Sequence, residues 1–159
     1  MDSGEDQPDD SPEYGGCVAC HGFRREETEF LEQMVARKDY QHPEIHTRLI
    51  ISHMPFTQLN VPPFDIEQLT YRRWTNLVAQ MNPDLILCGH AHVAQIRYPG
   101  CQEDAYGQPC PVVIGSGFAD QKRIWIGCGI AFSKGKLELT FTDSNGNVIE
   151  TQRIENDHE

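Results

Sequence analysis

Two histidines separated by a single residue, His90 and His92, follow directly after a short apolar run. The run, residues 84–88, lies between Pro83 and Gly89 and is typical of a buried strand. Side chains two positions apart point to the same side of an extended backbone, so we expect both imidazoles to face one way. Two neutral imidazoles at the mouth of a buried strand suit a metal ion better than a hydrophobic core.

A third histidine ends a second apolar run. Residues 48–52 lead into His53, and Pro55 prevents that strand from continuing. Between the two runs, helical spacing predicts a helix capped by Asp65 and closed by Pro83. Its predicted apolar face consists of Ile66, Leu69, Trp74, Leu77, Val78 and Met81. Strand, helix and strand in this order predict a right-handed crossover between parallel strands, so all three histidines should emerge at the ligand-binding carboxyl edge of one sheet.

The two strand ends resemble the last two signature blocks of the calcineurin-like metallophosphoesterases. Residues 50–55, Ile-Ile-Ser-His-Met-Pro, are similar to the block in which a histidine is followed shortly by proline. Residues 87–92, Leu-Cys-Gly-His-Ala-His, are similar to the Gly-His-x-His block. Segments within residues 2–31 and 111–117 also resemble bacterial members, so the resemblance covers nearly the whole chain.

This resemblance implies a fold, an activity and a set of ligands. The fold would be α/β, the C-terminal half of a four-layer αββα sandwich with a mixed sheet. His53 and His90 would be ligands of one metal ion and His92 a ligand of the other. The complete enzyme would use two divalent or trivalent ions, manganese, iron or zinc, to polarise a phosphate ester and activate a water.

Three earlier blocks of the family pattern do not occur in the chain: Asp-x-His, Gly-Asp-x-x-Asp and Gly-Asn-His followed by Asp or Glu. In the family they supply the bridging carboxylate, most ligands of the first metal and the histidine assigned to protonate the leaving group. The resemblance therefore implies that this chain lacks the N-terminal half of its domain, binds at most one metal ion and is inactive alone. The alternative is a non-catalytic, truncated remnant whose uncovered strand edges invite association.

Composition limits the classes of function. The chain has 159 residues, enough for one domain, and a net charge of −11, so it has no basic footprint for nucleic acid. No run approaches the ~18 apolar residues of a membrane span, and no signal peptide opens the sequence. We expect residues 1–16, which are acidic, to form a solvated and mobile lead-in, and residues 17–159 to be the C-terminal part of the phosphoesterase domain.

Two further regions have a clear periodicity. Residues 24–37 predict an amphipathic helix whose inward residues are Phe30, Leu31, Met34 and Val35. After Gly117 the pattern predicts three antiparallel strands, at residues 124–132, 136–142 and 147–154, with turns at Lys134-Gly135 and Asn145-Gly146. In the middle strand the inward residues should be Leu137, Leu139 and Phe141.

The segment Cys17-Val-Ala-Cys20-His21 matches the haem attachment pattern of c-type cytochromes. Electron transfer by a haem-binding protein is therefore the alternative function, from a different class. The β-rich remainder does not resemble a small helical cytochrome, and a match of five residues arises easily by chance. The same three side chains could begin a zinc site, but no second cysteine pair completes it.

The other four cysteines lie in two settings. Cys101 and Cys110 bracket a loop containing Gly and Pro and could form a disulfide in an oxidising compartment. Cys88 and Cys128 lie in apolar strands, and we expect them to be buried thiols that act as small hydrophobic residues.

Overall fold

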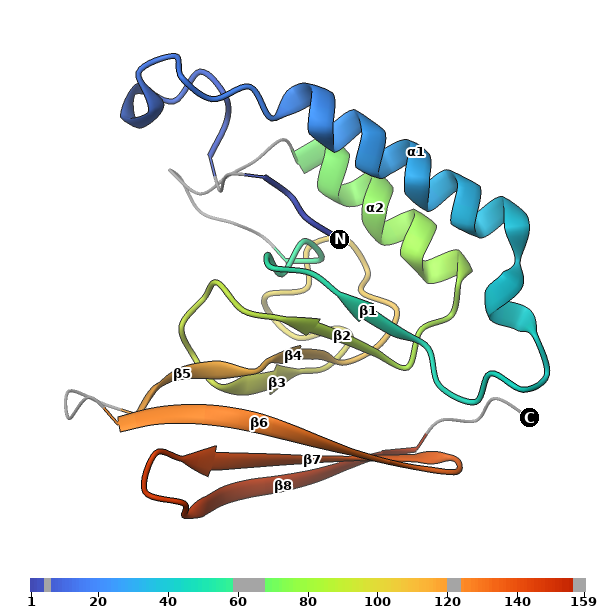
Figure 1. Cartoon of the computed structure of the whole chain (residues 1–159), viewed down its shortest axis with the longest axis vertical. Coiled ribbons are helices and arrows are strands. Elements are labelled where there is room, and N and C mark those ends of the chain that lie inside the picture. Colours follow the sequence, from blue (N-terminus) through green and yellow to red (C-terminus); the bar gives the residue numbers. More distant parts are fainter. Residues whose placement is uncertain (5–6, 59–67, 120–123, 156–159) are drawn as a thin grey trace.

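The computed structural model describes residues 1–4, 7–58, 68–119 and 124–155. This part of the chain is an α/β protein with two helices, a mixed four-strand sheet and a separate antiparallel four-strand sheet. Figure 1 shows three layers, in which the helices lie on one side of the mixed sheet and the antiparallel sheet lies on the other. Neither helix is long and apolar enough to cross a membrane.

The helices are α1 (His21–Arg37) and α2 (Gln68–Gln80), and short 3-10 turns cover Pro12–Tyr14 and Asp39–Gln41. The mixed sheet contains β1 (Leu49–Ile51), β2 (Leu85–Cys88), β3 (Gln95–Arg97) and β4 (Val112–Ile114), in the order β1-β2-β4-β3. The antiparallel sheet contains β5 (Ser116–Ala119), β6 (Ile124–Ser133), β7 (Lys136–Asp143) and β8 (Val148–Glu155), in chain order.

Strands β1 and β2 are parallel neighbours, which confirms the predicted parallel pairing. Leu49 pairs with Leu85 and Ile51 with Leu87, while β4 runs parallel to β2 on its other side. Helix α2 lies between β1 and β2 in the sequence, so their carboxyl ends lie at the same edge of the sheet. The predicted cap Asp65 and the predicted face residue Ile66 lie outside the described residues.

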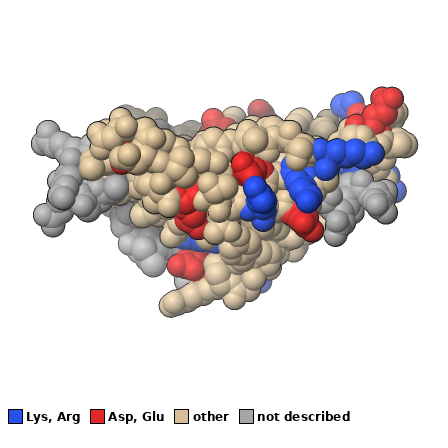
Figure 2. Space-filling model, turned by 90° about the horizontal axis from the view of Figure 1, so that it is seen from below, with Lys and Arg blue, Asp and Glu red and all other residues tan. Residues whose placement is uncertain are grey.

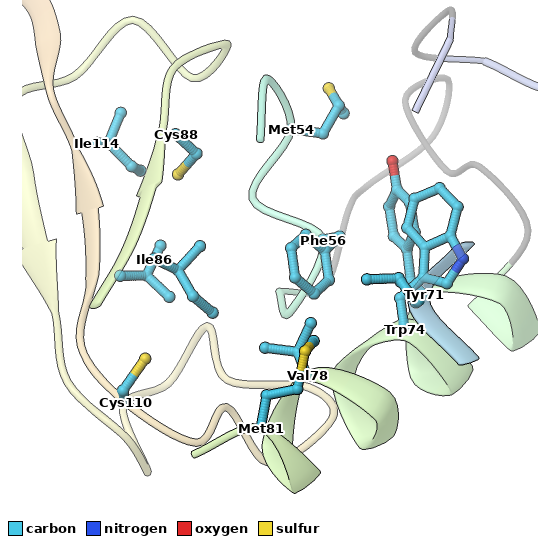
Figure 3. Packing of buried hydrophobic residues seen from close by; sticks show 12 residues of the cluster. Met54, Phe56, Tyr71, Trp74, Val78, Met81, Ile86, Cys88, Cys110 and Ile114 are labelled. Carbon is cyan, nitrogen blue, oxygen red and sulfur yellow. The ribbon is translucent and has the colours of Figure 1, made fainter. Parts of the chain in front are cut away.

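Strand β2 is buried on both faces, which explains its uninterrupted apolar sequence. Ile86 and Cys88 pack toward the helices, in a cluster with Phe56 and Trp74 (Figure 3). Leu85 belongs to a second cluster, together with residues of the antiparallel sheet: Leu137, Leu139 and Phe141. Full burial of each such side chain contributes about 1.5–3 kcal/mol, so the mixed sheet is held from both sides.

The predicted inward faces of the described helices are correct except at Leu69 and Phe30. On α2, Trp74 and Val78 are fully buried, but Leu69, in the first turn, is 79% exposed. On α1 the buried stripe is Arg24, Thr28 and Leu31. Phe30, which lies about 100° around the helix from Leu31, is half exposed instead of inward.

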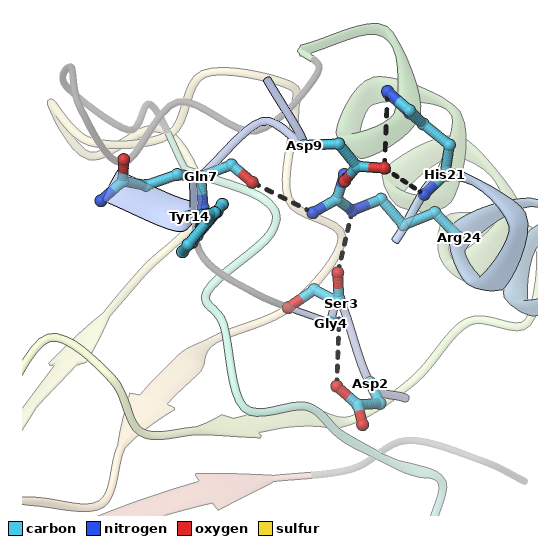
Figure 4. Close-up of polar contacts among 8 residues, drawn as sticks. All are labelled: Asp2, Ser3, Gly4, Gln7, Asp9, Tyr14, His21 and Arg24. Carbon is cyan, nitrogen blue, oxygen red and sulfur yellow. Dashed lines mark hydrogen bonds and ion pairs between the residues drawn. The ribbon is translucent and has the colours of Figure 1, made fainter. Parts of the chain in front are cut away.

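Arg24 is buried because the opening segment folds over α1 (Figure 4). Its Nε donates to the carbonyl oxygen of Ser3 (2.9 Å) and its Nη2 to that of Gln7 (3.3 Å), and its Nη1 contacts Asp9 Oδ1 (3.3 Å). Asp9 Oδ2 also accepts the backbone N–H of His21, the first residue of α1. Part of the expected solvated lead-in is therefore packed against the helix, because these carbonyls and this carboxylate satisfy the guanidinium.

Replacing Arg24 by Ala should lower the free energy of unfolding by about 3 kcal/mol or more, because the change leaves its buried carbonyl partners unsatisfied. Urea denaturation measures this loss. Arg25→Ala is the matched control, since Arg25 is exposed on the same turn and its replacement should change stability by no more than about 0.5 kcal/mol. Equal effects of the two variants would contradict this account of the opening segment.

The antiparallel sheet confirms the predicted hairpins, with strand ends within about one residue of those expected. The turn glycines Gly135 and Gly146 have positive φ values of 72° and 85°, a conformation that glycine adopts without strain. Along β7, Leu137, Leu139 and Phe141 are buried as predicted. Their period of two places the inner face of β7 in the core between the two sheets.

The turn before β8 contains a carboxylate that titrates below its ordinary range. The side chain and backbone N–H of Asn147, together with the N–H of Asn145, donate to Asp143 and hold the pKa of its carboxyl below 3.8. The carboxylate therefore stabilises the fold above pH 3.8, and this contribution is lost as the pH falls through the lower native pKa. Urea denaturation over the acid range should show a weaker pH dependence for Asp143→Asn than for the wild type. Identical slopes would show that the turn does not couple stability to pH.

Candidate metal centre

Backbone pairing between β1 and β2 continues beyond both strands and brings the first two histidine segments together. The N–H of Ser52 donates to the carbonyl oxygen of Leu87 (2.9 Å), and the N–H of Gly89 donates to that of His53 (3.0 Å). On the other side, the N–H of Gly115 donates to Cys88 (3.0 Å). The backbone just before His90 is therefore hydrogen-bonded on both sides, to the segment after β1 and to the segment after β4.

The imidazoles of His53 and His90 lie side by side at this edge. Nε2 of His53 is 3.4 Å from Nδ1 of His90, and the ring centroids are 5.2 Å apart with an angle of 80° between the planes. Two nitrogens bound to one tetrahedral zinc ion at about 2.0–2.1 Å are about 3.3–3.4 Å from each other. The pair therefore has the spacing of two ligands of a single ion.

The backbone of the Gly-His-x-His segment is not extended. The N–H of Ala91 donates to the carbonyl oxygen of Gly89 (2.7 Å), which closes a three-residue turn around His90. His90 has a φ of 61° and His92 a φ of 53°, both in the left-handed region that non-glycine residues rarely adopt. The prediction that both imidazoles face one way assumed an extended backbone, and that assumption is wrong because this turn reverses the chain at His90.

His92 does not join the other two histidines in one ligand group. Across the described ranges, no group of three or more His, Cys, Asp or Glu side chains could hold a metal ion. The expectation of three imidazoles around one centre is thus not met in this part of the chain. The individual ligand roles of His53, His90 and His92 stay predictions.

A surface cavity of about 420 Å³ adjoins the histidine pair. Its described lining residues are Met1, Ile51, Ser52, His53, Leu87, Cys88 and Gly89. The described lining contains no carboxylate, and its one histidine is His53. Cys88 belongs to the helix-side core, and burial raises the pKa of its thiol to about 12.

Gly117, in β5, allows the segment after His90 to pack closely against the antiparallel sheet. A Cβ atom added to Gly117 would lie 2.6 Å from the carbonyl oxygen of His92, 2.7 Å from Cα of Val93 and 2.8 Å from the nitrogen of Ala94. Real Cβ atoms essentially never approach other atoms so closely. The sequence contains the signal for this contact, since a glycine inside a strand often marks a close backbone approach.

The cysteine motifs form no comparable site. Cys20 is the residue before α1 and His21 is its first residue, while Cys17 is exposed. All six cysteines are free, including Cys101 and Cys110, which are not joined in a disulfide. The haem function of the Cys17-Cys20-His21 segment stays the alternative. Cys88 is buried as expected, whereas Cys128 is only partly buried.

Comparisons with known proteins do not identify the chain. No protein-family model matches it, and no curated protein matches it either. Its function is therefore inferred from the histidines and from the strand ends that position them.

Replacing Gly117 by Ala should displace the segment that carries His92 and lower the free energy of unfolding by about 1–3 kcal/mol, because the contacting atoms are backbone. Urea denaturation gives the stability, and the imidazole NMR signals of His92 report its displacement. Gly127→Ala is the control, since a Cβ at Gly127 meets nothing within 4 Å and should leave stability unchanged or raise it by up to about 1 kcal/mol. Unchanged His92 signals in Gly117→Ala would contradict the positioning role.

Proposed function

We propose that this chain is part of a calcineurin-like metallophosphoesterase, a metal-dependent hydrolase of phosphate esters. The observation that supports the proposal most directly is the 3.4 Å separation of Nε2 of His53 from Nδ1 of His90. The two residues follow parallel neighbouring strands, at the sheet edge where α/β proteins commonly bind ligands. Their segments are also the two that resemble the signature blocks of the family.

In this proposal, each histidine has a distinct role. His53 and His90 would hold one metal ion through the two facing nitrogens, and His92 would contribute to a second ion. Such a pair of ions would polarise the phosphoryl group and activate water. Imidazole together with carboxylate ligands suits manganese, iron or zinc. The hydrogen bonds of Gly89 and the turn around His90 hold the ligands in place before any ion arrives.

The finer fold assignment is also a proposal. We propose that the two helices, the mixed sheet and the antiparallel sheet form the C-terminal half of a four-layer αββα sandwich. The fourth layer and the three carboxylate-bearing blocks would then belong to an N-terminal half that lies outside this sequence. The parallel β1-β2-β4 core, with its helices on one face and the second sheet on the other, supports this assignment.

The chain alone should bind one ion at most and hydrolyse phosphate esters poorly or not at all. Two cations about 3.5–4 Å apart repel each other strongly, and neutral imidazoles carry no negative charge to offset this repulsion. The missing carboxylate blocks would supply that charge. A partner that carries them would therefore be required for activity.

Calorimetric titration of the purified chain with zinc tests the proposed pair. We expect one ion per chain, and we expect His53→Ala and His90→Ala each to weaken binding by at least about tenfold, since each removes one of two close ligands. His42→Ala is the control, because His42 follows the 3-10 turn Asp39–Gln41 and its Nδ1 accepts the N–H of Glu44. Equal affinity in the wild type and both alanine variants would contradict the pair as a metal site.

An assay with p-nitrophenyl phosphate and its bis ester, with manganese or zinc added, tests the activity of the same samples. Turnover should remain far below the ~1–10³ s⁻¹ usual for enzymes. Turnover in that range that is lost in His92→Ala would show that the site is complete without further carboxylates. Addition of an N-terminal segment bearing the three missing blocks should restore hydrolysis, and its failure to do so would count against the family assignment.

A further inference from the structure

Strand β1 is an edge strand of the mixed sheet, because the described sheet has the order β1-β2-β4-β3. The N–H of Ser52 donates to β2, and the backbone groups of successive residues in a strand point alternately to its two sides. The N–H and C=O groups of Leu49 and Ile51 therefore point away from β2. An edge strand presents such groups as a template on which another strand can pair.

One of these outward groups is already occupied by the opening residue. The nitrogen of Met1 donates to the carbonyl oxygen of Ile51 (2.7 Å). Within the described ranges, no hydrogen bond reaches the carbonyl oxygen of Leu49 or the N–H groups of Leu49 and Ile51. The contact of Met1 is thus a single position of a backbone ladder whose other positions are open in this part of the chain.

The direction of the opening segment fits a parallel strand. From Met1, the chain continues past the carboxyl end of β1 in the direction in which β1 runs (Figure 1). A segment joined to Met1 from the other side would therefore lie along β1, parallel to it. In the parallel pattern, the residue two positions before Met1 would donate to the carbonyl oxygen of Leu49 and accept the N–H of Ile51. The hydrogen bond of Met1 already has the register that this pattern requires.

The side chain of Ile51 is the apolar surface that such a strand would cover. It is 64% exposed, although Leu49, on the same face of β1, packs against the core between the sheets. Parallel strands are usually buried on both faces, so an exposed isoleucine on a parallel edge strand indicates a missing neighbour. On the other face, Met1 and Ile50 both pack against the helix-side core.

Charge does not distinguish another docking surface on the side of the antiparallel sheet. Figure 2 shows this side, and on its described part positive and negative side chains lie next to one another on a mostly uncharged surface. The strands of this sheet carry ion pairs such as that of Arg153 with Glu138, in which Nε lies 2.8 Å from Oε2. The edge of β1, in contrast, has open backbone groups in a fixed pattern, which specifies both the kind of partner and its direction.

We propose that a strand of the N-terminal half runs parallel to β1 into Met1 and extends the mixed sheet at this edge. The strand belongs to the half that the proposed function requires, and the inference rests on that function. It pairs with Leu49 and Ile51 and covers the side chain of Ile51. Its carboxyl end opens onto the cavity that Met1 and His53 line, so the two halves of the domain meet beside the candidate metal centre.

The competing occupant of the edge is the charged amino group of Met1 alone. Its nitrogen lies 3.9 Å from Glu27 Oε1, and an ion-paired terminus that also donates to Ile51 would close the edge without a strand. Such a terminus uses only these two acceptors, whereas a strand also pairs with the backbone of Leu49 and with the N–H of Ile51. Hydrogen exchange at these backbone groups separates the two occupants.

Amide hydrogen exchange of chains extended before Met1 tests the strand. The probe is the extension Val-Thr-Val-Thr-Val-Thr, whose valines fall on the side of Met1 and Ile50, and a Ser-Gly extension of equal length is the control that removes the same amino charge. We expect the strand-forming extension to slow exchange of the Leu49 and Ile51 amides by at least about tenfold relative to the control. The amide of Ile50, which points to β2, is the internal reference and should not change.

Proline in place of the last valine of the extension gives the matched variant. Proline has no N–H for the carbonyl oxygen of Leu49, so most of the added protection should be lost. Equal exchange in the strand-forming and Ser-Gly chains would overturn the proposal in favour of the charged terminus, and so would slow exchange of Ile51 in the unextended chain. Protection that grows with protein concentration would identify a second copy as the occupant and would overturn it too.

Zinc titration of the same chains reports the proposed function separately, because the extensions leave His53 and His90 unchanged. Protected amides without zinc binding would support the strand and count against the metal site. Zinc binding without protected amides would leave the metal site in place and overturn the strand.

Discussion

The parallel pairing of β1 with β2 is the constraint on which the candidate site depends. It extends past the strand ends, where the N–H of Gly89 donates to His53, so the two chain segments leave the sheet in contact. Both strands lie between packed layers, and any shift in their register would disturb the helix-side core and the core between the sheets together. The facing nitrogens of His53 and His90 are therefore positioned by a strand pair that contributes to both cores.

Two residues with unusual backbone conformations follow directly after β2. His90 and His92 have positive φ values, a conformation that costs free energy for a histidine and persists only when its surroundings enforce it. The hydrogen bond from the N–H of Ala91 to the carbonyl oxygen of Gly89 enforces the turn at His90. Close packing against Gly117 restrains the segment that follows His92. Such enforced conformations are common at functional sites, because ligands that are already in place lose little entropy on binding.

The helix layer and the antiparallel sheet differ in what covers them. On the helix side, the opening segment closes over Arg24 and satisfies a buried guanidinium with carbonyl oxygens and Asp9. On the opposite side, no described element covers the antiparallel sheet, and its outer face balances its charges by cross-strand pairing. An arginine within a helix can be predicted to be exposed from its type alone, whereas its burial here depends on residues about twenty positions earlier in the chain.

The sequence by itself determined the elements whose signals are local. The apolar runs at 48–52 and 84–88, the period of two along β7 and the glycine turns at Gly135 and Gly146 all predicted the observed strands, and the strand-helix-strand order predicted their parallel pairing. Only the tertiary structure decided which histidines meet. The approach of His53 to His90 and the packing of Gly117 against the backbone of His92 depend on contacts between distant segments, and no periodicity in a single segment predicts such contacts.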